Sequence, residues 1–195
     1  MNDETLNYYD NNAQDFSSST FSVDFQEVQE KFIKYLCPGA KILDFGCGSG
    51  RDTKYFLSRG FDTEAVDGSS ELCALASKNT GIEVKQMLFH ELSAKEEYDG
   101  IWACASILHL PMGELKEVVK KLYEALKASG VLYASFKYGD FEGIRNGRYF
   151  TDINEERLHS LLQEVKGFTP IELWISEDVR PGREEEKWLN CILKK

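Results

Sequence analysis

One short stretch constrains the fold of this chain more than any other part. Residues 42–53 read ILDFGCGSGRDT, so apolar residues and one acid run directly into three glycines spaced two apart. This order predicts a buried strand, a tight turn and the start of a helix. Glycines at such a turn allow a positive φ and let a ligand touch the backbone, and a helix start offers unpaired N–H groups. The stretch therefore predicts a site for a nucleotide-like cofactor.

Strands and helices alternate along the chain around this turn. The residue pattern predicts strands at 41–45, 63–66, 83–87, 101–105 and 131–136, and helices at 25–36, 52–58, 69–78 and 112–126. Such alternation is typical of a parallel sheet with helices on both of its faces.

The C-terminal part of the chain departs from this alternation. A helix is expected at 154–165, and two strands follow at 169–176 and 187–193. The loop between these strands is polar and contains Pro181 and Gly182. The two strands can therefore pair as an antiparallel hairpin at one edge of the sheet.

A chain of 195 residues is expected to form one domain with a core of its own. We divide it into an arm or lid at 1–24, a cofactor-binding core at 25–136, and a segment at 137–195 that holds the acceptor loop, the last helix and the hairpin. The arm is polar with several aromatic residues, which fits either a frayed terminus or a docked lid.

Composition and charge narrow the range of partners. The net charge of −10 argues against tight binding to nucleic acid or to an anionic membrane, because both need clustered Lys and Arg. The five cysteines are scattered without a CxxC pair, so we expect no metal site, no disulfide framework and a cytoplasmic location. No apolar run approaches the roughly 20 residues that span a bilayer. We expect a monomer or a homodimer.

Two cofactors fit a strand, glycine turn and helix. The dinucleotide fingerprint G-x-G-x-x-G would place its third glycine where this chain has Arg51, and the chain has G-x-G-x-G instead. Asp67 follows the second strand, where a carboxylate can accept both ribose hydroxyls of an adenosine. Asp67 and Gly68 could also form a simple turn. The glycine spacing favours S-adenosylmethionine, and NAD stays as the alternative cofactor.

Four segments together carry a family resemblance. ILDFGCGSG (42–50), VDGS (66–69), YDGIWACASILHL (98–110) and LKASGVLYASF (126–136) resemble the motif series of class I S-adenosylmethionine-dependent methyltransferases. The resemblance covers about residues 5–195 and extends to small methyltransferase-domain proteins that include tellurite-resistance-type enzymes. It implies a Rossmann-like α/β fold, with a seven-stranded sheet ordered 3-2-1-4-5-7-6 and strand 7 antiparallel.

The resemblance also implies an activity. The chain would transfer a methyl group in line from S-adenosylmethionine to a small-molecule acceptor and release S-adenosyl-L-homocysteine. A NAD-dependent oxidoreductase is one alternative to this activity. A non-catalytic module that binds S-adenosylmethionine is the other.

The resemblance further implies which residues contact the cofactor. The glycine turn would pass beneath the methionine part, Asp44 would place the amino group, Asp67 would bind the ribose, and the end of the fourth strand would lie under the sulfonium. The expected cofactor-binding residues are Tyr9, Phe16, Asp44, Gly46, Cys47, Gly48, Gly50, Asp67, Gly68, Ser69, Leu88, Phe89, Cys104, Ala105 and Leu108.

One position departs from the family pattern. Many relatives have an acid after the third strand that accepts from the adenine amino group, and this chain has Leu88 followed by Phe89. We expect backbone N–H groups and apolar contact to hold adenine here. Asp52 and Glu91 are the alternative acids.

Methyl transfer from a sulfonium depends mainly on alignment of the acceptor, and a general base helps only where the nucleophile starts protonated. His109 is the candidate catalytic base because it follows the fourth strand, and ligands lie at the carboxyl ends of parallel strands. The alternative is a histidine that only hydrogen-bonds its own loop.

The acceptor site is expected to form from the arm and from the insertion DFEGIRNGRYF at 140–150, which its glycines should make mobile. The arginines of this insertion either hold an anionic acceptor, such as a small oxyanion, or are solvated charges. The candidate substrate-binding residues are Tyr8, Arg145, Arg148 and Tyr149.

Overall fold

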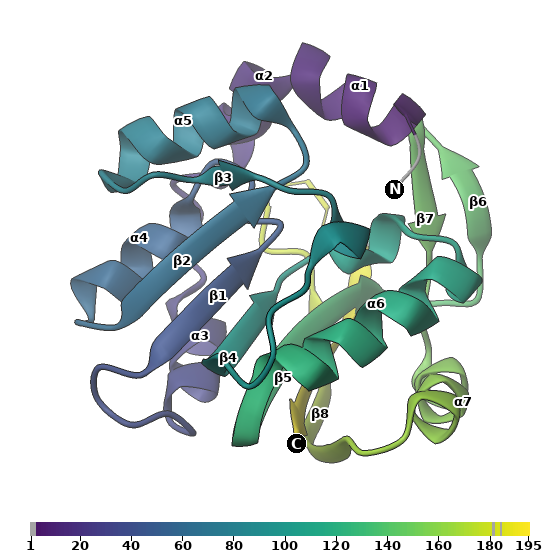
Figure 1. The fold of residues 1–195 in the computed structure, drawn as a ribbon. Helices are drawn as coiled ribbons and strands as arrows, with labels where there is room; N and C mark the ends of the chain where they lie inside the picture. The colour runs from purple at the N-terminus through teal and green to yellow at the C-terminus, as the bar shows by residue number, and fades with distance from the viewer. Residues whose placement is uncertain (1–2, 181, 184) are drawn as a thin grey trace.

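The computed structural model describes residues 3–180, 182–183 and 185–195. Its centre is a seven-stranded sheet in the order β3-β2-β1-β4-β5-β9-β8, which confirms the predicted topology (Figure 1). β1 to β5 pair in parallel, and β9 is antiparallel to both of its neighbours. The strands are β1 (Lys41–Phe45), β2 (Asp62–Asp67), β3 (Lys85–Gln86), β4 (Tyr98–Ala103), β5 (Leu126–Lys137), β8 (Thr169–Glu177) and β9 (Lys187–Lys194).

Side chains alternate between the two faces of the central strands, and both faces are buried. Ile42, Trp102 and Tyr133 pack with apolar residues of the helices α3 and α4. The next residues along the strands, such as Leu43, pack on the opposite face with α6 and α7. This double burial explains why the central strands are apolar throughout. The helices that cover the sheet are α3 (Gln26–Ile33), α4 (Arg51–Ser58), α5 (Ser70–Thr80), α6 (Met112–Ala125) and α7 (Glu155–Val165).

Local side-chain chemistry sets several helix ends. The Ser69 hydroxyl accepts from the backbone N–H of Leu72 at 3.2 Å, so Ser69 is the N-cap of α5. Asn154 caps α7 in the same way. β5 begins earlier than its apolar run predicts, and this start is irregular, with a shift in its pairing to β4 and a φ of +66° at Ser129.

The N-terminal residues form two short helices, α1 (Asp3–Asn11) and α2 (Ala13–Thr20), which favours a docked arm over a frayed terminus. α1 spans the space between α5 and a hairpin of β6 (Glu142–Arg145) and β7 (Arg148–Thr151) (Figure 1). That hairpin replaces the mobile loop expected at 140–150. Asn146 and Gly147 form its turn with φ of +52° and +74°, as Asn-Gly pairs do in tight hairpins.

The hairpin of β8 and β9 forms as predicted at one edge of the sheet. Pro181 of the expected connecting loop lies outside the described residues. No helix among the described residues is long and apolar enough to cross a membrane.

A buried carboxylate joins three elements, α3, α4 and β4, next to the glycine turn. Asp52 accepts from the Gln29 amide at 2.7 Å, from the Trp102 indole at 2.8 Å and from the Arg51 guanidinium at 2.8 Å. Trp102 in turn stacks on Tyr133 with the ring centres 3.9 Å apart. Burial alone would raise the pKa of Asp52, but Arg51 and the hydrogen bonds hold it below its ordinary value.

Asp52→Asn should lower the free energy of unfolding by about 3–5 kcal/mol, because it leaves the largely buried Arg51 guanidinium without its anion. Urea unfolding at pH 7 measures this. Glu27→Gln is the control, since the Lys31–Glu27 pair is exposed and its loss should change little. Equal losses in the two variants would contradict a structural role for Asp52.

Candidate functional site

The glycine turn after β1 requires its glycines for two separate reasons. Gly46 and Gly48 have φ of +84° and +57°, which favour glycine. A Cβ on Gly46 would lie 2.4 Å from the Ser106 Cβ, so the ends of β1 and β4 approach too closely for any side chain. The backbone N–H groups of Gly46 and Cys47 both donate to the Val66 carbonyl, which ties the turn to β2.

Asp67 fixes this turn from the end of β2. Its two carboxylate oxygens accept from the backbone N–H groups of Gly48 at 2.8 Å and Ser69 at 2.9 Å. Burial raises the pKa of Asp67 to about 6 although these donors oppose the shift. The carboxylate lines a cavity, so its remaining lone pairs can accept from a ligand.

A cavity of about 630 Å³ runs from the glycine turn to the β6–β7 hairpin. It brings together many of the residues singled out from the sequence. These lining residues are Tyr9, Phe16, Gly46, Cys47, Gly48, Asp67, Gly68, Phe89, Cys104, Ala105, Leu108, His109, Arg145 and Arg148.

Four of the expected cofactor residues lie behind the cavity wall. Asp44 is buried and accepts from the Thr53 hydroxyl at 2.6 Å, and burial followed by the nearby Asp52 raises its pKa. Gly50 packs against α5, where a Cβ would lie 2.7 Å from the Thr80 Cγ2. Ser69 caps α5. Leu88 is the fourth expected cofactor residue that does not line the cavity.

The region after β3 offers no free acid to adenine. The Leu88 backbone N–H donates to the Glu91 carboxylate at 2.7 Å, so both the expected N–H and one alternative acid already have partners. Asp52, the other alternative, is held by Gln29, Arg51 and Trp102. The cavity wall is apolar here, formed by Leu72 and Phe89.

Two of the expected acceptor residues also point away from the cavity. The Tyr8 ring lies 4.4 Å from the Arg148 guanidinium and supports it from behind. The Tyr149 hydroxyl contacts Glu142 at 3.2 Å, while its carbonyl faces His109. The alternation of the strand explains this placement, because Arg148 and Phe150 flank Tyr149 and both line the cavity.

His109 is buried and uses both ring nitrogens. Nδ1 lies 2.6 Å from the Tyr149 carbonyl, which can only accept, so Nδ1 carries the proton. Nε2 then accepts from the Tyr9 hydroxyl at 2.8 Å. Burial lowers the pKa of His109 to about 4, so the ring is neutral and a weak base. This geometry fits a His109 that positions the Tyr9 hydroxyl better than a His109 that removes a proton from an acceptor.

α1 holds the two ends of the cavity together. Asp10 on this helix accepts from the Ser69 hydroxyl at 2.6 Å, next to Asp67. Thr5 accepts from the Tyr149 backbone N–H at 3.0 Å, and Tyr9 bonds His109. The arm therefore contacts both the glycine-turn end and the hairpin end.

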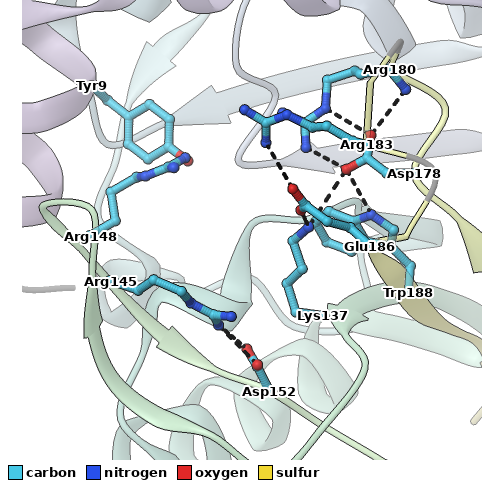
Figure 2. Close-up of polar contacts among 10 residues, drawn as sticks. All are labelled: Tyr9, Lys137, Arg145, Arg148, Asp152, Asp178, Arg180, Arg183, Glu186 and Trp188. Carbon is cyan, nitrogen blue, oxygen red and sulfur yellow. Dashed lines mark hydrogen bonds and ion pairs between the residues drawn. The ribbon is translucent and has the colours of Figure 1, made fainter.

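The hairpin end of the cavity is highly charged (Figure 2). Arg145 donates to both oxygens of Asp152, at 2.6 and 2.9 Å. Asp178 accepts from Arg180 at 2.8 Å and from the Trp188 indole at 3.1 Å.

Lys137 belongs to the same charged cluster, where it bonds Glu186, and burial lowers its pKa to about 8. The sequence motifs did not point to Lys137. Its place at the carboxyl end of β5, where ligands bind in parallel sheets, is the signal that could have identified it. Asp178 and Trp188 carried no comparable local signal.

The cavity thiols are not poised as nucleophiles. Burial raises the pKa of Cys104 to about 12 and that of Cys47 well above its ordinary value. Both cysteines therefore stay protonated near neutral pH.

His109→Asn should reduce the acid sensitivity of the fold. The folded pKa of about 4 lies below the ordinary 6.5, so the unfolded chain binds a proton that the folded chain excludes. Stability from neutral His109 is therefore complete above about pH 6.5 and is lost as the pH falls toward 4. Between pH 7 and 4.5, urea unfolding should show about 2–3 kcal/mol more loss in the wild type than in His109→Asn. Parallel losses would contradict a neutral, buried His109.

Comparisons with known proteins agree with this geometry. A family model described as a methyltransferase domain matches residues 42–130. A protein of Geobacillus sp. (strain WCH70) that is named as a methyltransferase is 33% identical over 113 residues, covering 54% of this chain and 46% of that protein. An uncharacterized methyltransferase of Staphylococcus carnosus (strain TM300) is 23% identical over 153 residues, covering 71% and 74%. The chain spans about half the length of the first relative.

A solved structure shares the fold over nearly the whole chain. The 1,6-didemethyltoxoflavin-N1-methyltransferase of Burkholderia thailandensis was solved with 1,6-didemethyltoxoflavin and S-adenosylhomocysteine bound. It superimposes with a TM-score of 0.76 at 22% identity, over 97% of this chain and 84% of that one. Residues 42–130 of this chain therefore match a methyltransferase domain, and the chain shares its overall fold with a solved S-adenosylmethionine-dependent methyltransferase.

Proposed function

We propose that the protein transfers a methyl group from S-adenosylmethionine to a small-molecule acceptor. The observation that carries the proposal is the continuous cavity, which joins the glycine turn and Asp67 to the β6–β7 hairpin. Such a cavity can hold a donor and an acceptor side by side. S-adenosylmethionine supplies an activated methyl group on a sulfonium.

The donor end fits an adenosine with an attached amino acid. Asp67 has lone pairs left for ribose hydroxyls, and Leu72 and Phe89 offer apolar contact to adenine. Cys104 and Ala105, at the end of β4, line the middle of the cavity. Ala105 adopts a φ of +49°, an uncommon conformation for a residue with a side chain, and such strain often marks a functional turn.

The chemistry asks little of the protein beyond alignment. The bond from sulfur to the methyl carbon breaks, its electron pair stays on sulfur, and a lone pair of the acceptor forms the new bond to carbon. We assign Tyr9 and His109 the positioning of the acceptor, with neutral His109 orienting the Tyr9 hydroxyl. Tyr9 of α1 and Phe16 of α2 line the cavity, so these helices cover part of it and would limit the access of water.

The alternative cofactor, NAD, gains no support from the turn. Arg51 occupies the place of the third dinucleotide glycine, and its guanidinium lies 4.4 Å from the Phe25 ring while bonded to Asp52. Calorimetric titration with S-adenosylmethionine, S-adenosylhomocysteine and NAD separates the two. Binding of NAD without binding of either sulfur nucleoside would overturn the proposal.

A methyltransferase transfers the methyl group to an acceptor, whereas a non-catalytic module only binds S-adenosylmethionine. We expect methyl transfer from labelled S-adenosylmethionine to at least one compound of a small-molecule panel. Binding of the cofactor with no transfer to any compound would favour the non-catalytic alternative. We also infer a reducing, cytoplasmic setting, which the five free thiols support.

Asp67→Ala should weaken binding of S-adenosylhomocysteine by about 2–3 kcal/mol, or roughly 30- to 150-fold in Kd, because ribose hydroxyls lose a charged acceptor. Calorimetry measures the change. Asp62→Ala is the matched control, since Asp62 is exposed at the start of the same strand. Unchanged affinity in Asp67→Ala would remove this residue from the ribose site.

The affinity for S-adenosylhomocysteine should depend on pH through the same carboxylate. The pKa of Asp67 is raised to about 6, and hydroxyl donors prefer its ionised form. Affinity should therefore be full at pH 7.5 and fall roughly tenfold at pH 5, as the carboxylate takes up a proton. In Asp67→Asn the affinity should be low at both pH values. An equal pH dependence in both proteins would assign the effect to another group.

A further inference from the structure

Arg148 is a half-buried cation that lines the acceptor end of the cavity and pairs with no described carboxylate. Arg145 pairs with Asp152, Arg180 with Asp178, and Lys137 with Glu186. Figure 2 shows the pairs of Asp178 and Glu186 on the right, the Arg145–Asp152 pair at the bottom, and Arg148 at the left beside Tyr9. Within the described part of the chain, Arg148 forms no ion pair with a carboxylate.

Aromatic rings hold Arg148 in place instead of a carboxylate. Its guanidinium lies 4.4 Å from the Tyr8 ring centre and 5.2 Å from that of Phe150. Its one hydrogen bond to a described residue is long, from Nη1 to the Tyr9 hydroxyl at 3.5 Å. Cation–π contacts orient the group but do not neutralise its charge.

The guanidinium also has an unused donor. The Arg148 Nε is buried and has no hydrogen-bond partner among the residues that the structure describes. A buried donor without an acceptor is costly. Nε and the adjacent Nη2 form one edge of the guanidinium, and that edge matches the two oxygens of a carboxylate.

Arg145 provides an internal comparison. It lines the same cavity and its Nε is also unpartnered, but Asp152 already accepts from its Nη2 with both oxygens. The charge of Arg145 is therefore compensated within the protein. The two arginines stand opposite each other in the β6–β7 hairpin, and only Arg148 has charge to spare for a ligand.

The groups beside Arg148 do not supply the missing negative charge. His109 is neutral, and after burial the positive charge of Arg148 contributes to the low pKa of His109. Burial raises the pKa of Tyr9, so the Tyr9 hydroxyl also stays uncharged at neutral pH. The positive charge of Arg148 therefore faces the cavity uncompensated.

We propose that the methyl acceptor is a small organic acid whose carboxylate binds the Arg148 guanidinium. This inference rests on the proposed methyltransferase function. Arg148 connects through Tyr9 to His109, which ends the segment after β4 that lines the donor end. An acid anchored at Arg148 can therefore place another of its atoms toward the methyl group.

The test uses the full chain saturated with S-adenosylhomocysteine and a panel of aliphatic and aromatic carboxylates, each paired with its primary amide. Thermal unfolding measures the stabilisation by each compound. We expect at least one acid at about one hundred times its Kd to raise the midpoint by roughly 5–10 °C, and its amide to have no effect. Arg148→Gln should abolish this gain, and Arg148→Lys should keep only part of it, because the charge remains without the planar edge.

Arg59→Gln is the matched control, since Arg59 is exposed and pairs with Glu30 away from the cavity. It should respond to acids as the wild type does. Wild-type preference for neutral compounds, the absence of any preference for an acid over its amide, or an unchanged acid response in Arg148→Gln would each overturn the inference. Calorimetry with S-adenosylhomocysteine on the same samples tests the donor site by itself, so failure of the proposed function is seen separately.

Discussion

The contact between the ends of β1 and β4 determines how the rest of the site is built. Gly46 lies so close to Ser106 that no side chain fits between the two strands, and the Ser106 hydroxyl donates to the Phe45 carbonyl at 2.6 Å. This contact fixes the glycine turn against the segment that follows β4. Asp67 then holds the turn from β2. The donor end of the cavity is thus made from three adjacent strand ends with little freedom between them.

Charge is distributed differently at the two ends of the cavity. At the donor end, the carboxyl groups of Asp44 and Asp67 both have raised pKa values because they are buried. At the acceptor end, ion pairs compensate most charges within the protein, whereas Arg148 forms no ion pair with a described carboxylate. At neutral pH the Asp67 carboxylate is still mostly ionised, so under the proposed function a cationic donor would lie near Asp67 and an anionic acceptor near Arg148.

Much of the sheet could be predicted because its signals are local. The bounds of β1 and the cap at Ser69 follow from short patterns of burial and capping. The β6–β7 hairpin was missed although Asn146 and Gly147 carry a strong turn signal, because the flanking residues lack clear alternation between apolar and polar side chains. Local sequence therefore predicts the elements better than it predicts the short insertion between them.

The candidate site divides in the same way. Gly46 and Asp67 belong to strand ends whose position follows from the sheet topology, so motif spacing is enough to find them. The bond between Tyr9 and His109 joins residues one hundred positions apart, and no local pattern encodes it. The protonation of the two His109 ring nitrogens also depends on groups from different elements. The same is true of Arg148, which contacts aromatic rings instead of a described carboxylate. These features become visible only when the arm, the hairpin and the sheet are assembled.

The bridging position of α1 has a consequence for ligand exchange. This nine-residue helix bonds Ser69 at the donor end and Tyr149 and His109 at the acceptor end. A short helix moves as one rigid piece, so lifting it breaks contacts at both ends in a single event. Under the proposed function, lifting α1 would therefore open the donor end and the acceptor end of the cavity together.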